Sequence, residues 1–84
     1  MRLVWTKTAW ADYLYWQTND KKKLKRINEL IKATMREPFE GLGKPEALKH
    51  DLQGYYSRRI DTEHRLVYSL KENELTIVAC RYHY

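Results

Sequence analysis

The stretch KKKLKRINELIKATMR, residues 21–36, has the clearest periodicity in the sequence. Its apolar side chains recur at intervals of three and four residues, which places them in one stripe along a helix, while charged side chains cover the rest. The stripe consists of Leu24, Ile27, Leu30, Ile31 and Met35. The helix should end near Glu37, because the residue before a proline is sterically excluded from the helical region. We therefore predict an amphipathic helix over residues 21–36.

A shorter helix is predicted on the N-terminal side of this stretch. Residues 3–5, Leu-Val-Trp, are typical of a short opening strand. Thr6 or Thr8 can cap a helix that runs to about Thr18 and carries its apolar residues on one face. Asp20 can then cap the helix that follows.

The chain changes character twice after the long helix. Residues 38–54 contain both prolines and all three glycines, which predicts a loop, and a loop of this length in a small domain is usually functional or disordered. Beyond it the apolar residues alternate with a period of two, which predicts strands at 55–60, 64–70 and 75–82. The order β-α-α-β-β-β defines an α+β fold, in which a mainly antiparallel sheet carries two helices on one face.

The register of the last two strands depends on the loop that joins them. Lys71-Glu72-Asn73 fits a three-residue hairpin loop, a type I turn followed by a left-handed residue, which asparagine tolerates. In that register the face toward the helices carries Leu66, Tyr68, Leu70, Val78, Cys80 and Tyr82. The open face carries Arg65, Ala79, Arg81 and His83. A loop of two or four residues would put His83 on the opposite face from Arg65.

Sixteen Lys and Arg against eleven Asp and Glu give the 84-residue chain a formal charge of +5. Such a basic protein favours a polyanionic partner such as nucleic acid, although a surface charged only for solubility has the same composition. The single cysteine, Cys80, rules out an internal disulfide and indicates a reducing compartment. The N-terminus lacks the pattern of a signal peptide, and no stretch approaches the ~20 apolar residues of a membrane span. We expect one cytoplasmic domain, residues 1–84, without membrane contact.

The residues that remain for chemistry are a carboxylate, several cations and a histidine near the C-terminus. The histidines and Cys80 lack the paired spacings of zinc sites, so neither a metal nor another cofactor is expected. A metal-free ribonuclease needs a base for the RNA 2′-hydroxyl, fixed positive charge for the phosphorane and an acid for the departing 5′-oxygen. Glu46, Arg65 and His83 could fill these three roles.

Other cations and aromatic side chains could hold the RNA. The candidates for contact with neighbouring phosphates are Lys44, Lys49, Arg58, Arg59 and Arg81. Bases could stack, at about 1–3 kcal/mol each, on Tyr55, Tyr56, Tyr82 and Tyr84.

Each assignment has a simpler alternative. A glutamate in a loop is usually solvated, an arginine on an open sheet face usually pairs with a carboxylate, here Glu63, and a penultimate histidine usually frays. Tyrosines in strands more often pack than bind bases. His50 and His64 are interpreted as structural residues that bond to the backbone. From the residues alone, ribonuclease activity is one hypothesis among the functions of small basic domains.

The order of residues along the chain also resembles that of a known protein family, which the spacing of the candidate residues alone does not reveal. The matching stretches are WADYLYW (10–16), INELIK (27–32), PFEGLGKPE (38–46), LKH (48–50), SRRI (57–60), EHRLVY (63–68) and CRYHY (80–84). In these stretches the chain resembles, over its whole length, the YoeB toxins of the RelE-like toxin–antitoxin family. The combination of motifs, with the last at the C-terminal end, is highly specific. The resemblance implies the RelE/YoeB-like microbial ribonuclease fold.

In activity, the resemblance implies the toxin of a type II toxin–antitoxin system, a translation-dependent endoribonuclease that cuts messenger RNA in the ribosomal A site. Its product would end in a cyclic or 3′-phosphate. Carried over residue by residue, Glu46 is similar to the general base and Arg65 to the phosphate stabiliser. His83 is similar to the general acid, and Tyr84 closes the site beside it.

The resemblance also implies contacts with RNA and with other proteins. Lys49 and Arg59 are similar to the RNA-contacting cations of the family, and Lys44 is a further candidate near Lys49. A YefM-type antitoxin, encoded alongside, is expected to neutralise the toxin, and a homodimer is left open. The basic run Lys21–Arg26 is at most an accessory surface for RNA or the ribosome.

Two other functions remain open at this point. ParE-like relatives resemble the same architecture but act as non-catalytic toxins that bind DNA gyrase. A small module that only binds nucleic acid would also account for the charge. Glu46, Arg65 and His83 discriminate between these options, because a protein that only binds has no need of all three.

Overall fold

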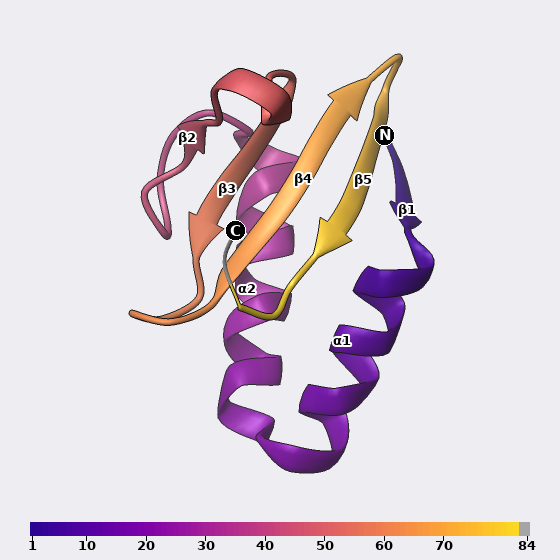
Figure 1. The fold of residues 1–84 in the computed structure, drawn as a ribbon, viewed down its shortest axis with the longest axis vertical. Helices are drawn as coiled ribbons and strands as arrows, with labels where there is room; N and C mark the ends of the chain where they lie inside the picture. Colours follow the sequence, from indigo (N-terminus) through magenta and orange to yellow (C-terminus); the bar gives the residue numbers. More distant parts are fainter. Residues whose placement is uncertain (83–84) are drawn as a thin grey trace.

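The computed structural model describes residues 1–82, which form two helices on one face of a five-stranded sheet (Figure 1). The helices are α1, Lys7–Asn19, and α2, Lys21–Arg36. The strands are β1, Arg2–Trp5; β2, Glu46–Ala47; β3, Tyr55–Arg59; β4, Arg65–Lys71; and β5, Glu74–Ala79, and a 3-10 turn spans His50–Leu52. Their order across the sheet is β1-β5-β4-β3-β2; β1 is parallel to β5 and the other neighbours are antiparallel. The predicted α+β fold is confirmed.

Side chains cap both helices where the sequence offers them. The Thr6 hydroxyl oxygen accepts from the Ala9 N–H at 3.0 Å and donates to the Val78 carbonyl at 2.9 Å, which ties the start of α1 to β5. Asp20 accepts from two N–H groups in the first turn of α2. Thr6 is therefore the cap of α1, and the predicted bounds of α2 are confirmed.

The core lies between the helices and the covered face of the sheet. Its buried residues include Ala9 and Trp16 of α1, Ile27, Leu30 and Ile31 of α2, and Leu66, Tyr68, Leu75 and Ile77 of the strands. Met35, the last residue of the predicted stripe, lies in the final turn of α2 and is 39% exposed. In the part of the chain that the structure describes, neither helix has the length and apolar character to cross a membrane.

The loop between β4 and β5 has two residues rather than the predicted three. Lys71 pairs with Glu74, and the two residues between them, Glu72 and Asn73, have φ angles of 47° and 65°. Two consecutive left-handed residues are the pattern of a type I′ turn, whose twist matches that of the flanking strands. The shorter loop shifts the register by one residue.

A β-bulge corrects this shift farther along the same pair of strands. Tyr68 pairs with Ile77 but Val67 pairs with Ala79, so Val78 is an extra residue on β5. Before the bulge Ile77, rather than the predicted Val78, faces the helices. Beyond it Ala79 lies on the open face opposite Val67, as predicted. The wrong loop length and the unforeseen bulge therefore cancel at Ala79 and Cys80.

The last strand ends at Ala79 rather than at Tyr82. Cys80 is buried, as predicted, whereas Tyr82 is 54% exposed and is not packed in the core. The φ angle of Tyr82 is 61°, a left-handed conformation that a strand cannot contain.

Strand β2 lies within the segment that the sequence predicts as a loop. Glu46 pairs with Ser57, and Ala47 pairs with Tyr56. Two residues are too few to produce the alternation by which a strand is recognised in a sequence. This short strand nevertheless determines which way Glu46 points.

Candidate active site

The strand register gathers three of the predicted site residues on the open face of the sheet. Glu46, Ser57 and Val67 stand opposite one another across β2, β3 and β4. Arg59 stands opposite Arg65, two residues farther along the same strands. Residues directly opposite each other share a face, and the residues that alternate with these on β4 pack against the helices. Glu46, Arg59 and Arg65 therefore all face away from the helices.

The separation of Glu46 and Arg65 suits a substrate that lies between them. Two strand spacings and two residue steps correspond to about 12 Å between their Cα atoms. Both side chains are long enough to reach inward over that gap, and Ser57 and Val67 form its floor. The arrangement can present a carboxylate and a guanidinium to opposite sides of one phosphodiester.

Arg65 keeps part of its hydrogen-bonding capacity free. Its backbone N–H donates to the Tyr82 carbonyl at 2.9 Å. Its buried NH1 nitrogen has no hydrogen-bond partner within residues 1–82. The alternative that Arg65 pairs with Glu63 is wrong for these residues, because the Glu63 carboxylate lies 3.5 Å from the His64 Nε2. A buried donor without an acceptor is unusual in a native protein, and a catalytic role, an ordered water or an ion can each account for one.

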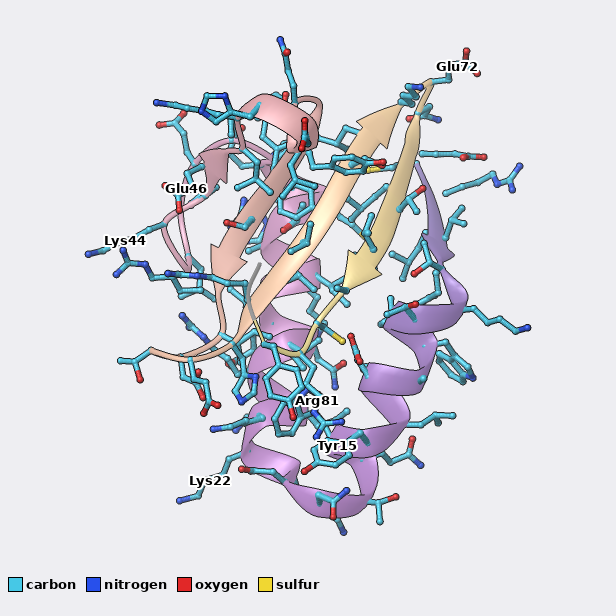
Figure 2. The ribbon with its side chains drawn as sticks, viewed as in Figure 1. Tyr15, Lys22, Lys44, Glu46, Glu72 and Arg81 are labelled. Atoms are coloured by element: carbon cyan, nitrogen blue, oxygen red, sulfur yellow. The ribbon has the colours of Figure 1, made fainter. Side chains whose placement is uncertain are left out.

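Three exposed cations surround Glu46. Lys44 and Lys49 flank it in the chain, and Arg59 stands on the adjacent strand. The Arg59 N–H donates to the Gly43 carbonyl at 2.7 Å, which holds the segment before Glu46 against β3. Figure 2 shows Lys44 and Glu46 projecting from the β2 edge of the molecule. The structure thus brings three of the five predicted phosphate-contacting cations to the region of the predicted base.

Arg58 is not available to phosphates, contrary to the prediction. It is completely buried on the helix side of β3, opposite Leu66. Its guanidinium donates to the carbonyls of Glu37, Glu40 and Leu42, and its Nε donates to the Tyr68 hydroxyl at 3.4 Å. The neighbouring Arg59 is exposed because side chains alternate along a strand. Arg58 holds the loop that precedes β2.

Arg81 also departs from its predicted place on the open face beside Arg65. Its guanidinium carbon lies 3.5 Å from the centre of the Tyr15 ring and 4.7 Å from that of the Tyr82 ring. Figure 2 shows Arg81 and Tyr15 together at the end of the molecule far from Glu46. The prediction extended β5 past Ala79, whereas the chain turns there toward α1.

Four hydrogen bonds fix the segment that follows β5. The Cys80 N–H donates to the Asp12 carboxylate at 3.0 Å, and the Trp16 indole N–H donates to the Cys80 carbonyl at 2.8 Å. The Tyr82 N–H donates to the His64 Nδ1 at 2.6 Å, and the Tyr82 carbonyl accepts from Arg65.

The predicted acid, His83, and the predicted neighbour, Tyr84, lie outside the described residues. The structural role predicted for His64 is confirmed by its bond to the backbone of Tyr82. The anchoring roles of Asp12 and Trp16 were missed by sequence reasoning. Their spacing of four residues, a polar and an aromatic side chain on one helix face, was the available signal.

The predicted base-stacking tyrosines separate into two groups. Tyr56 faces the helices and is partly buried against the core, with its ring 5.8 Å from that of Tyr68 and 5.2 Å from that of Phe39. Tyr55, opposite Ser69, is half-buried on the open face. Tyr82 is exposed.

Comparison with known proteins supports the same reading of the fold. The sequence model of the YoeB-like toxins of bacterial type II toxin–antitoxin systems matches residues 5–84. Toxin YoeB of Escherichia coli strain K12 is 62% identical over 84 residues, which cover all of both chains. A structure described as a YoeB/ParE toxin from Agrobacterium tumefaciens superposes with a TM-score of 0.98 at 50% identity over the whole of both chains.

Staphylococcus aureus YoeB has been solved as a dimer and in a heterotetrameric complex with YefM. These structures have TM-scores of 0.92 and 0.91; each is 52% identical and covers 100% of this chain and 98% of the other. The family model and these relatives therefore place the chain in the class of toxins of bacterial type II toxin–antitoxin systems. Within that class, the chain belongs to the YoeB-like toxin family.

Proposed function

We propose that this toxin is a ribosome-dependent endoribonuclease that cuts translated messenger RNA in the ribosomal A site and so inhibits translation. The observation that carries the proposal is the register that puts Glu46 and Arg65 on one open face, about 12 Å apart. The buried Arg65 NH1, which has no acceptor within residues 1–82, supports a role toward an anionic substrate.

The proposed reaction is an attack of the RNA 2′-hydroxyl on the adjacent phosphorus, without a metal. Glu46 takes the hydroxyl proton as the 2′-oxygen bonds to phosphorus, and Arg65 stabilises the charge on the phosphorane. The bond from phosphorus to the 5′-oxygen breaks, and His83 gives that oxygen a proton. The products are a 2′,3′-cyclic phosphate and a 5′-hydroxyl. Tyr84 is proposed to close the site beside His83.

Lys44, Lys49 and Arg59 are proposed to bind the phosphates on either side of the cut. All three are exposed around Glu46, and contacts with phosphate fix the register of a bound strand. Binding to an A site requires a cytoplasmic location, which we include in the proposal.

The proposed protein partner is a YefM-like antitoxin, as in the S. aureus complex. A disordered acidic segment that folds on binding could cover a large part of this basic surface. A homodimer is proposed as a second state, because the S. aureus relative was solved as a dimer. Coexpression with the antitoxin should restore the growth that the toxin alone inhibits.

A ParE-like toxin that binds DNA gyrase is the second candidate. The description of the A. tumefaciens structure as YoeB/ParE favours keeping it in view. A comparison of RNA with DNA separates the two, because DNA lacks the attacking 2′-hydroxyl. A basic module that only binds nucleic acid would cut neither.

The decisive test is primer extension on a messenger that is being translated, with the toxin added. Wild-type protein should produce new 5′ ends, whereas Glu46→Gln and Arg65→Met should lose about 10²–10⁴-fold of the cleavage rate. A minimal free RNA, which should be cut more slowly than translated messenger, should lose none of that slower cleavage in EDTA. A substrate with a 2′-deoxy sugar at the cut should be inert. Cutting of that deoxy substrate would contradict the proposed chemistry.

A further inference from the structure

The buried imidazole of His64 holds the last residue that the structure describes. His64 is 5% exposed and immediately precedes β4. Its Nδ1 accepts the Tyr82 N–H at 2.6 Å, across 18 residues of chain. The ring also packs edge-on against Trp16, at 4.8 Å between ring centres and 80° between planes.

The surroundings of His64 orient this acceptor. Its backbone N–H donates to the Asp61 carboxylate at 2.7 Å, and its carbonyl accepts from Ile60 at 3.0 Å. Because Nδ1 is an acceptor, the proton of the neutral ring belongs on Nε2, where the Glu63 carboxylate lies 3.5 Å away. The ring is therefore held with its acceptor directed at Tyr82.

Tyr82 adopts a conformation that it would not keep without such contacts. Its φ angle of 61° is in the left-handed region, which is unfavourable for a residue other than glycine and persists only where the surroundings enforce it. The Tyr82 N–H binds His64 and its carbonyl binds the N–H of Arg65. Two consecutive residues, His64 and Arg65, thus hydrogen-bond to the N–H and the carbonyl of Tyr82.

We infer that His64 is a positioning residue, which holds the backbone of Tyr82, the last described residue, beside Arg65. The inference rests on the proposed function, in which His83, the next residue in the chain, is the general acid. It goes beyond that function by assigning the alignment of the acid to a buried side chain that touches no substrate. The alternative is that His64 only packs against Trp16.

Two substitutions of His64 distinguish the effect of its hydrogen-bond acceptor from the effect of its ring. His64→Asn keeps an acceptor close to the position of Nδ1 but removes the ring. His64→Phe keeps a ring of similar size against Trp16 but removes the acceptor. If His64 only packs, the Phe variant should behave like the wild type and the Asn variant should not. If His64 positions Tyr82, the order is reversed.

A third variant covers the case in which the Phe variant does not fold. His64→Gln places its amide near the position of Nε2, toward Glu63. Neither the Asn variant nor the Gln variant has a ring, so a comparison of the two isolates the position of the acceptor.

Amide hydrogen exchange at Tyr82, followed by NMR, tests the anchor without any activity. Loss of the acceptor should speed exchange at this amide about tenfold or more in the Phe and Gln variants, and leave it within about threefold of wild type in the Asn variant. Exchange as slow in the Phe and Gln variants as in wild type would overturn the inference.

Cleavage of translated RNA tests the consequence of the anchor. Misplacement of an acid by about 1 Å can cost about 10²-fold in rate, so the Phe and Gln variants should cut about 10–100-fold more slowly. The Asn variant should be rescued. Faster Tyr82 exchange without slower cleavage would also overturn the inference. A wild-type protein that cuts no RNA would overturn the proposed function alone, because the exchange measurement does not depend on it.

Discussion

The Cys80 side chain is completely buried, and its sulfur lies 3.7 Å from the Ala9 carbonyl oxygen. Burial, with a smaller contribution from the negative charge of Asp12, raises the pKa of the Cys80 thiol to about 12. The thiolate is the reactive form, so the native protein should resist alkylation by iodoacetamide at pH 8, whereas unfolded protein in urea should react fully. Mass spectrometry measures both. Rapid labelling without denaturant would show that this part of the core opens.

Arg58 and Arg59 are adjacent in the chain and face opposite sides of the sheet. Arg58→Met would leave three loop carbonyls without their donor, and each unsatisfied group costs about 1–3 kcal/mol. We therefore expect a loss of about 3 kcal/mol or more from the free energy of unfolding. Arg59→Met, at an exposed position, should cost less than about 0.5 kcal/mol. Urea denaturation compares the two, and equal effects would contradict the role assigned to Arg58.

An ion pair joins the turn between β3 and β4 to the start of α2. The Lys23 ammonium lies 2.7 Å from the Asp61 carboxylate, which also accepts the N–H groups of Glu63 and His64. Partial burial alone would raise the pKa of the Asp61 carboxyl, but these hydrogen bonds outweigh it and lower that pKa to about 2.

The lowered pKa makes this contribution to stability depend on pH. It should be fully present above about pH 4, where the carboxyl is ionised even in the unfolded chain, and be lost as the pH falls toward 2. Allowing for solvent screening, Asp61→Asn should cost about 1–2 kcal/mol at pH 7 and progressively less below pH 4. Urea midpoints at pH 7, 5 and 3 measure this, with the exposed Asp51→Asn as control. A difference that does not shrink with acid would exclude the ion pair as its cause.

The elements that the sequence predicted well are those with a long periodic pattern or a side-chain cap. Helix α2 carries sixteen residues of amphipathic pattern and is capped by Asp20, so its bounds follow directly. The two-residue strand β2 has no pattern of its own, and it forms because β3 offers it an edge. The bulge at Val78 is likewise a tertiary feature, since it fits β5 to β4 and to the start of α1 at once.

The same distinction applies to the candidate site. Arg58, Arg59 and Arg81 are alike as residue types, yet one lies in the core, one on the open face and one on a tyrosine ring. Parity along β3 would have separated the first two, had the strand been placed against its neighbours. The position of Arg81 depends on where β5 ends, which the sequence does not reveal. Residue types thus identified the candidate phosphate-binding cations, and only the sheet register showed which of them face the open side.

At the scale of the whole molecule, one face of the sheet packs against the helices and the other carries the proposed site. Both helices cover one face and form the core with it (Figure 1), which leaves the other face to carry Glu46, Arg59 and Arg65. The sheet order puts β2, β3 and β4 side by side, so residues from three separate segments meet there. A surface built in this way can change its charges without disturbing the core.

The net charge of +5 allows a test of whether binding uses this face or only the overall charge. Under the proposed chemistry, an RNA with a 2′-deoxy sugar at the cut should bind without being cleaved. If Lys44, Lys49, Arg59 and Arg65 contact phosphates, the logarithm of its binding constant should fall with the logarithm of salt concentration with a slope of about −3, from about −0.7 per contact.

Two variants that lose the same charge then discriminate between the site and the remainder of the surface. Arg59→Met should make the slope shallower by about 0.7, because one phosphate contact is lost. Lys22→Met, at the start of α2 and far from Glu46 in Figure 2, should leave the slope unchanged, although the net charge falls by the same amount. Fluorescence anisotropy between about 50 and 200 mM salt measures both. Equal changes of slope in the two variants would mean that RNA binding depends only on the total charge. That result would contradict the assignment of the open face as the binding site.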